Sequence, residues 1–182
     1  QLEGIPVLPA HPDGALNQLG AGALAGGSMT LSVGTSGALR LAANAPALSP
    51  SGRAWCYLSP VGWLAGTATS GACNCVDWCR QAFFPKDTGY EALEQGGCSG
   101  EELPVFLPFL FGERSPGWRD GRLGGFVGLR PSHTAYDLYH SVQEGVAMNL
   151  RQCYELLVEE RGRPEQIMLS GGILRSQRWT QL

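Results

Sequence analysis

The chain has 182 residues, which suits one domain or one domain with part of another. Its formal net charge is −3, and no basic stripe interleaves with aromatic residues, so a nucleic-acid partner is not expected. No apolar run is long enough to cross a bilayer, which argues against a membrane partner. Charged residues make up only 16% of the chain, below the usual quarter or so of a soluble domain. This deficit predicts surface that another domain covers, or a second copy of the chain in a homodimer.

The start of the chain predicts a piece of a longer protein, and its cysteines predict the cellular compartment. Residues 1–4 contain no initiating methionine and no basic region of a signal peptide, so we expect a piece of a longer protein. The six cysteines lack the spacing of a disulfide framework, which favours a reducing cytoplasm. Cys73, Cys75 and Cys79 could bind a metal, but no second pair lies at zinc-like spacing. Structural or free thiols are therefore the favoured interpretation, and no metal ligands are predicted.

The first half of the chain predicts hairpins around one helix. We expect a short strand at 5–8, a Pro-Asp-Gly turn at 12–14 and a helix at 15–25, ended by two glycines. Alternating residues predict a hairpin of strands 29–33 and 38–42. A proline-serine connection at 47–53 leads to a second hairpin of strands 55–58 and 62–66.

The second half predicts one long helix between irregular segments. A helix is expected at 71–84, an irregular surface connection at 86–102, and an apolar stretch broken by prolines at 103–111. The longest helix should run over 135–160, with Ser132 or Thr134 as its N-cap and Gly162 after its end. A strand at 167–169, a turn at 170–172 and a helix from Arg175 follow. The predicted fold class is α/β.

The GTSG turn, Gly34-Thr35-Ser36-Gly37, is the first candidate site. A glycine-flanked turn exposes backbone N–H groups, and its two hydroxyls add donors, so it suits phosphate oxygens. The alternative is a plain hairpin turn, which the motif taken alone favours.

Three further segments have both a structural and a functional interpretation. Gly171 and Gly172, between a strand and a helix, could let an anion approach or could simply let helix and sheet pack. Asp13 could be ordinary turn chemistry, or beside a phosphate site it could accept a proton from a reacting hydroxyl. The neighbouring Glu113 and Arg114 favour a structural ion pair that fixes a loop over a contact with a ligand.

Five segments in this order resemble the FGGY family of carbohydrate kinases. GIPVLPAHPDGALNQLGAGAL resembles the segment with the catalytic aspartate, and LSVGTSGALRL its second phosphate loop. LPFLFGERSPGW and GGFVGLRPSHTAYDLYHSVQEGV are similar to the GER-x-P block and the C-terminal signature. LSGGILRSQRWTQL is similar to the adenosine motif. One position departs from the signature: Gln143 stands where a bulky apolar residue is usual.

The resemblance implies a ribonuclease H-like fold of the actin type, truncated at both ends. Residues 1–27 would end the N-terminal domain and residues 28–182 would form the nucleotide-binding C-terminal domain. It also implies ATP and Mg²⁺, with Asp13 as catalytic base. The implied nucleotide-binding residues are Gly34, Thr35 and Ser36 at the phosphates, Gly171 and Gly172 near the α-phosphate and ribose, and Ser176 near the adenine.

The implied function is ATP-dependent phosphorylation of a hydroxyl on a small-molecule sugar or sugar acid. The sequence pattern D-G-x-L-x-x-L-G-x-G that begins at Asp13 resembles the gluconate kinase branch, with xylulokinase-type pentulose kinases as the alternative. A non-catalytic, nucleotide-binding remnant of the fold is the other alternative. The segment alone is expected to be inactive, since the resemblance places most sugar contacts outside it.

Overall fold

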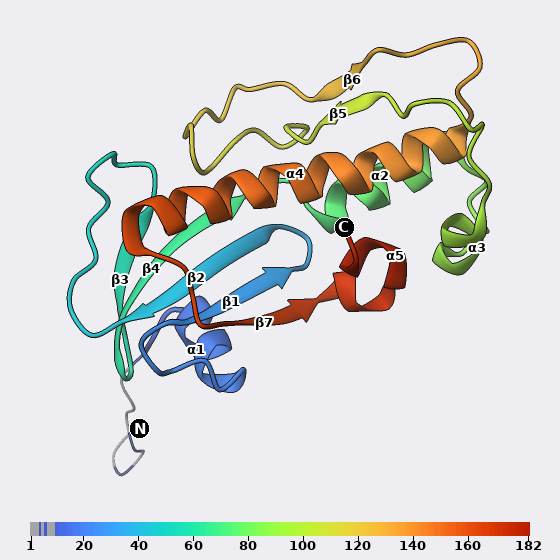
Figure 1. Ribbon diagram of the computed structural model, residues 1–182. Helices are drawn as coiled ribbons and strands as arrows, with labels where there is room; N and C mark the ends of the chain where they lie inside the picture. The colour runs from blue at the N-terminus through green and yellow to red at the C-terminus, as the bar shows by residue number, and fades with distance from the viewer. Residues whose placement is uncertain (1–3, 5, 7–9) are drawn as a thin grey trace.

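A five-stranded sheet forms the centre of the molecule (Figure 1). The structure is a computed structural model that describes residues 4, 6 and 10–182, so the strand expected at 5–8 falls largely outside the described residues. The strand order is β3-β4-β2-β1-β7. The strands are β1 (Ser28–Val33), β2 (Gly37–Ala43), β3 (Trp55–Ser59), β4 (Gly62–Thr69) and β7 (Gln166–Gly171).

Both predicted hairpins are present, and they join through β2 and β4. The pairs β1–β2, β2–β4 and β3–β4 are all antiparallel. The last strand, β7, adds to the free edge of β1 in parallel, with Val33 opposite Gly171. The β strands and the helices described below confirm the predicted α/β class.

The longest helix, α4 (Ala135–Arg161), lies across one face of the sheet (Figure 1). It has 27 residues, close to the predicted extent. Its other side contacts a two-stranded sheet of β5 (Val105–Leu107) and β6 (Gly125–Val127). The predicted apolar stripe is buried at Val142, Val146, Leu150, Cys153 and Leu157. Burial from two sides explains why this helix carries little charge on its middle turns.

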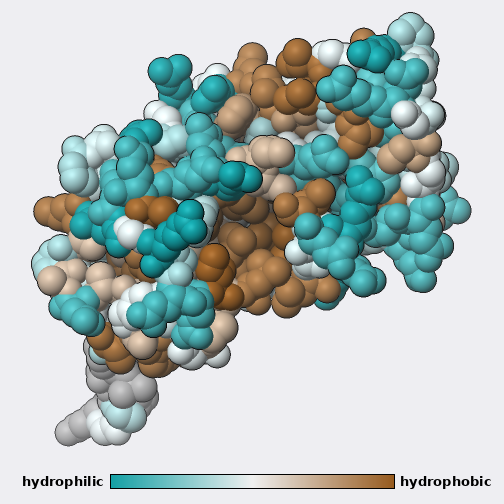
Figure 2. Space-filling model, viewed as in Figure 1, coloured by the Kyte–Doolittle hydropathy of each residue, from teal (hydrophilic) through white to brown (hydrophobic). Residues whose placement is uncertain are grey.

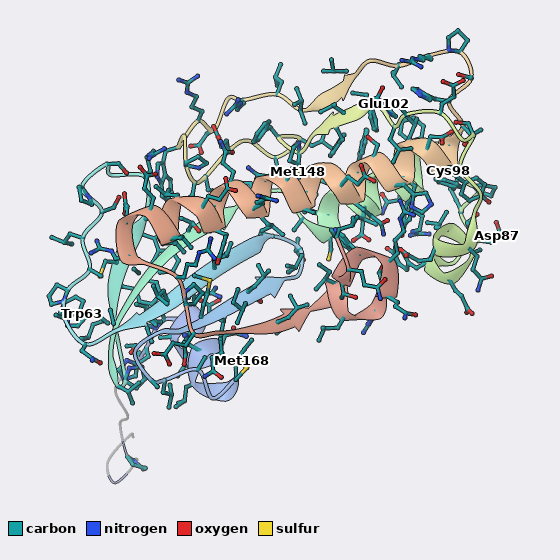
Figure 3. The ribbon with its side chains drawn as sticks, viewed as in Figure 1. Trp63, Asp87, Cys98, Glu102, Met148 and Met168 are labelled. Atoms are coloured by element: carbon teal, nitrogen blue, oxygen red, sulfur yellow. The ribbon has the colours of Figure 1, made fainter. Side chains whose placement is uncertain are left out.

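Asp137 fixes the start of α4. Thr134 is the N-cap, and Thr134 and Asp137 form a reciprocal capping box. The other oxygen of Asp137 accepts from Ser99 N at 2.9 Å and from Ser99 Oγ at 3.1 Å. Ser99 belongs to the connection that carries Cys98 and Glu102 past the start of α4 (Figure 3). One buried carboxylate therefore ties this connection to the helix.

Helices α2 (Cys73–Phe83) and α3 (Tyr90–Gln95) lie on the same side of the sheet as α4 (Figure 1). The prediction of α2 is confirmed, but the expectation of an irregular connection over 86–102 is wrong at α3. Leu93 is the one fully buried residue of α3, and a single apolar residue shows no helical period.

Helix α1 (Asp13–Gly20) lies on the opposite face of the sheet (Figure 1). The predicted turn at 12–14 is instead the helix start, with Pro12 as N-cap, and the helix ends earlier than expected. The buried Gln18 anchors it: Thr30 Oγ1 donates to Gln18 Oε1 at 2.5 Å, and Gln18 Nε2 donates to Ala23 O at 2.7 Å. A satisfied buried amide of this kind fixes one helix position.

The cysteines of the C-x-C-x3-C cluster are free, as are the other three. Cys75 and Cys79 are buried in the core, and burial raises the pKa of each thiol to about 12. Among the described residues no helix is long and apolar enough to span a membrane.

Apolar side chains remain exposed on the surface. Leu123 is 84% exposed and Met148, on α4, is 66% exposed (Figure 3). Figure 2 shows apolar surface around a hollow near the centre of one face, between two polar areas. This distribution is in line with the low content of charged residues.

Acid should weaken the capping box. Burial alone would raise the pKa of Asp137, but hydrogen bonds from Thr134 and Ser99 lower it to about 2. A lowered pKa in the folded state gives stability that is present above the unfolded value near 4 and is lost as the pH falls towards 2. We therefore expect the free energy of unfolding, measured by urea titration, to decrease between about pH 4 and 2.

The Asp137→Asn variant should show less of this acid dependence. It should also lose about 1–3 kcal/mol at pH 7, because buried donors lose their acceptor. Asp87→Asn, at an exposed position, is the control and should retain the acid dependence of the wild type. An equal acid dependence in all three proteins would contradict the role of Asp137.

Candidate functional site

Three chain segments meet where β1 and β7 end. Because the two strands are parallel, the GTSG turn after β1 and Gly171-Gly172 at the end of β7 lie at the same edge of the sheet. The first turn of α2 completes the group: Cys73 N donates to Gly34 O at 2.9 Å, and Asn74 N donates to Thr35 O at 3.2 Å. Segments more than a hundred residues apart are thus brought together.

The GTSG turn keeps two backbone donors free. Gly34 N donates to Ser36 O at 3.0 Å, and Gly37 N donates to Thr69 Oγ1 at 3.1 Å. The N–H groups of Thr35 and Ser36 donate to no acceptor in the described part of the chain, and both residues are exposed. The turn therefore presents two N–H groups and two hydroxyls to a ligand, an arrangement suited to an anion.

Gly171 allows β7 and β1 to come close at this edge. Its φ is +101°, and a Cβ there would lie only 2.3 Å from Val33 O. At Gly172 a Cβ would lie 3.1 Å from Cys73 Sγ. Glycine is needed at position 171 because of the neighbouring strand β1, rather than for a helix to pack on the sheet, and both glycines are exposed.

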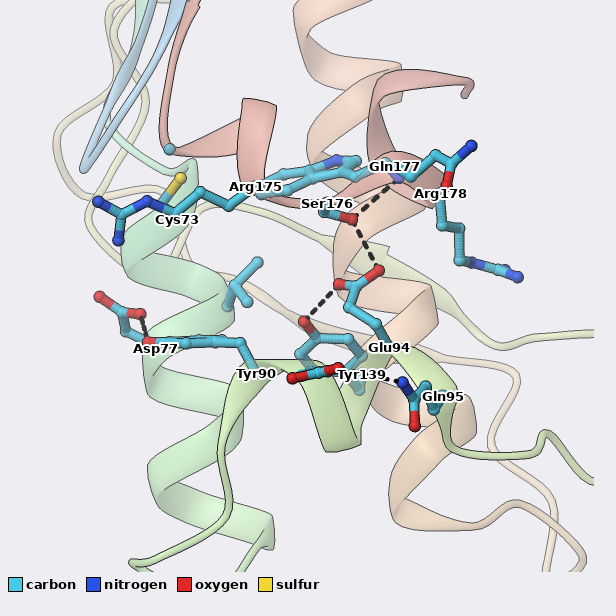
Figure 4. A pocket seen from close by; sticks show the side chains of 14 residues that line it. Cys73, Asp77, Tyr90, Glu94, Gln95, Tyr139, Arg175, Ser176, Gln177 and Arg178 are labelled. Carbon is cyan, nitrogen blue, oxygen red and sulfur yellow. Dashed lines mark hydrogen bonds between the residues drawn. The ribbon is translucent and has the colours of Figure 1, made fainter.

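A cavity of about 790 Å³ begins next to this edge (Figure 4). Its walls come from α2, α3, the first turns of α4, the 3-10 helix η1 (Gly172–Arg175) and helix α5 (Gln177–Thr180). Of the predicted nucleotide-binding residues, Gly172 and Ser176 line it. Gly34, Thr35, Ser36 and Gly171 border its end through Cys73 and Gly172. Its volume suits a small organic ligand.

Glu94 joins three walls of the cavity. Its Oε1 accepts from Tyr139 Oη at 2.8 Å, and its Oε2 accepts from Ser176 Oγ at 2.7 Å (Figure 4). Its Oε1 also accepts from Gln143 Nε2 at 2.6 Å. Burial, and then the nearby Glu94, raise the pKa of Tyr139. We call these four residues the Glu94 network. The sequence reasoning missed Glu94 because it lies in the segment expected to be irregular.

Asp13 lies apart from the cavity, on the α1 face of the sheet. It is exposed at the first position of α1, and its Oδ1 accepts from Gly14 N at 2.7 Å. A Cβ at Gly14 would lie 2.5 Å from both Arg40 Nε and Tyr57 Oη, so glycine lets these side chains approach the helix start. Burial raises the pKa of Tyr57, Arg40 lowers it, and the charge of Asp13 raises it. Asp13, Arg40 and Tyr57 therefore form one polar group.

Glu113 forms an ion pair, but not with the predicted partner. It is buried and accepts from Arg122 Nη1 at 2.8 Å, whereas Arg114 makes no ion pair among the described residues. The Arg122 guanidinium also lies 4.2 Å from the centre of the Phe109 ring. The structural interpretation thus fits Glu113, and the expectation that its neighbour in sequence is the partner is wrong.

The comparison with known families agrees with this geometry. A sequence model for the C-terminal domain of the FGGY family of carbohydrate kinases matches residues 29–182. The chain belongs to the FGGY family. Its fold is accordingly the ribonuclease H-like fold of the actin type, as the sequence resemblance predicted.

Both gluconate kinases and xylulose kinases are similar to this chain. The gluconokinase of Bacillus subtilis is 30% identical over 97% of the chain, and the xylulose kinase of Escherichia coli is 30% identical over 98%. The solved gluconate kinase and xylulose kinase of Lactobacillus acidophilus superpose with TM-scores of 0.79 and 0.81, each at 32% identity, over 92% and 93% of the chain. The chain spans 37% of the curated relatives and 35% of these two structures.

Gly171 should contribute to the stability of the fold in a way that Gly34 does not. Gly171→Ala places a side chain against Val33 O in a left-handed conformation, so we expect a loss of at least about 2 kcal/mol in the free energy of unfolding. Gly34→Ala places its Cβ in open space and should change stability by less than about 0.5 kcal/mol. Urea titration measures both, and equal effects would contradict the close β1–β7 contact as the reason for Gly171.

Proposed function

We propose that this chain supplies the nucleotide site and the catalytic base of an ATP-dependent kinase for a sugar or sugar acid. The meeting of the GTSG turn, Gly171-Gly172 and the cavity at one sheet edge carries the proposal, because phosphates and a nucleoside need adjoining sites of these two kinds. Residues 1–27 would belong to the preceding domain, together with Asp13, and residues 28–182 to the nucleotide-binding domain.

The residues present fit ATP. The free N–H groups of Thr35 and Ser36, with Gly34, suit the inner phosphates. Gly171 and Gly172 are exposed, which suits backbone contacts with the α-phosphate and ribose. Ser176, inside the cavity, suits the adenine. Mg²⁺ bound to the phosphates would neutralise charge there. The described residues contain no group of three or more acidic, histidine or cysteine side chains around a common point.

Asp13 is proposed to accept the proton of the sugar hydroxyl. Gly14 N holds its carboxylate at the start of a helix that Gln18 anchors to β1. Asp13 and the cavity lie on opposite faces of the sheet, and in this proposal the sugar hydroxyl meets the terminal phosphate beyond the GTSG turn at the strand ends. Phosphoryl transfer needs such positioning more than covalent chemistry.

A sugar acid of the gluconate type is the proposed substrate. The residue pattern after Asp13 and the similarity to gluconokinase support it. Arg40, whose side chain approaches Gly14, provides a cation that favours an anionic sugar. The similarity to xylulose kinases supports a pentulose as the second candidate. Assays of the full-length protein with ATP, Mg²⁺ and either gluconate or xylulose decide between them. Binding of ATP without phosphorylation of either sugar would support a non-catalytic role.

The Asp13→Asn variant of the full-length protein tests the base. We expect kcat to fall at least about a hundredfold, because a general base contributes about that much. The dissociation constant of ATP, measured by calorimetry, should stay unchanged since Asp13 is far from the cavity. Asp87→Asn, at an exposed aspartate outside the site, is the matched control. Near-normal turnover of Asp13→Asn would show that the base lies elsewhere.

A further inference from the structure

The Glu94 network sets the direction of a hydrogen bond at Ser176. An ionised carboxylate only accepts, so Ser176 Oγ donates its single proton to Glu94 Oε2 over 2.7 Å. The same oxygen accepts from Trp179 N at 3.1 Å. A hydroxyl has one proton and two lone pairs, so Ser176 keeps one lone pair for a ligand and no proton. In this state Ser176 is an acceptor.

Ser176 lies at the end of the cavity away from the GTSG turn. Gly172 is next to Cys73, whose N–H binds the turn, whereas Ser176 is at the start of α5 and contacts Glu94 (Figure 4). Ser176 lines the cavity and is only 8% exposed, so a ligand in the cavity would reach it with little competition from bulk solvent. A nucleotide with its phosphates at the turn would therefore present its base to Ser176.

We propose that Glu94 is a specificity-determining residue, which makes Ser176 an acceptor and so selects a purine with an amino group at C6. The amino group of adenine donates a hydrogen bond to the free lone pair of Ser176. The oxygen that hypoxanthine carries at C6 is itself an acceptor and would face that lone pair without a proton between them. The inference rests on the proposed function, because it requires a nucleotide in this cavity.

Glu94→Gln should invert this preference. Tyr139 and Gln143 both donate to the Oε1 position, so the amide oxygen introduced by the substitution should occupy that side. Its NH₂ group then points to Ser176 and donates to it. With both lone pairs used by this amide and Trp179 N, the Ser176 proton becomes free to donate to an oxygen at C6.

The experiment compares the dissociation constants of ATP and ITP for the full-length protein by calorimetry with Mg²⁺. The wild type should prefer ATP, and Glu94→Gln should shift the ATP-to-ITP ratio towards ITP by at least about tenfold. The matched control is Glu102→Gln, which removes the same charge at an exposed position. Glu102 does not line the cavity, so the ratio of this variant should remain that of the wild type.

A Ser176→Ala background makes the test specific. There the preference for ATP should be lost, and adding Glu94→Gln should change the ratio no further. A wild-type ratio in Glu94→Gln, or the same shift with and without Ser176, would overturn the proposal. A change in discrimination against 2′-deoxy-ATP, with the ATP-to-ITP ratio unchanged, would overturn the assignment to the base.

The failure of this inference differs from the failure of the proposed function. Tight ATP binding with an unchanged ratio contradicts only the role of Glu94, whereas a wild type that binds neither nucleotide contradicts both. Thermal melts check the folding of each variant. If Glu94→Gln does not fold, the loss of ATP preference in Ser176→Ala alone supports the proposal, and an unchanged preference overturns it.

Discussion

The parallel pairing of β1 with β7 is the contact on which the site depends. Backbone hydrogen bonds align Val33 with Gly171, so the residues after both strands reach the same edge. The close approach requires glycine at position 171. Without this register the GTSG turn would be an ordinary hairpin turn, and the cavity would lack the wall formed by η1 and α5. The chemistry proposed for this edge follows from one strand register.

The strands and helices that bury a regular pattern of apolar side chains could be predicted well from the sequence. The β1–β2 hairpin alternates apolar and polar residues, and α4 repeats apolar residues every three to four positions, so their type and approximate bounds could be predicted. The GTSG turn and the double glycine could be recognised for a different reason, because glycine is typical of tight turns. Each motif alone also had a structural explanation, and only their order along the chain favoured a site.

The polar contacts could not be predicted, because they join residues far apart in the sequence. Ser99 and Asp137 are separated by 38 positions, and Glu94 and Ser176 by 82. Neither pair leaves a periodic pattern, and α3 contributes a single buried leucine. The predicted partner of Glu113 was wrong for a similar reason: a loop brings Arg122 back to it, whereas the neighbouring Arg114 forms no ion pair in the described part of the chain. Local spacing predicts backbone structure better than it predicts which charges meet.

The parallel pairing of β1 with β7 also determines the order in which the strand pairs can form during synthesis. The β1 strand is synthesised before its partner β7, which follows only after 138 further residues, the separation of Ser28 and Gln166. At about 5–20 residues per second, a ribosome needs roughly 7–30 s to cover that distance. During this interval the edge of β1 that later pairs with β7 has no partner. The antiparallel part of the sheet, made of strands β1, β2, β3 and β4, can already form from contacts that are closer in sequence. The edge proposed to bind a nucleotide therefore forms only after β7 has been made, and until then a nascent chain is exposed to wrong strand pairing at that edge.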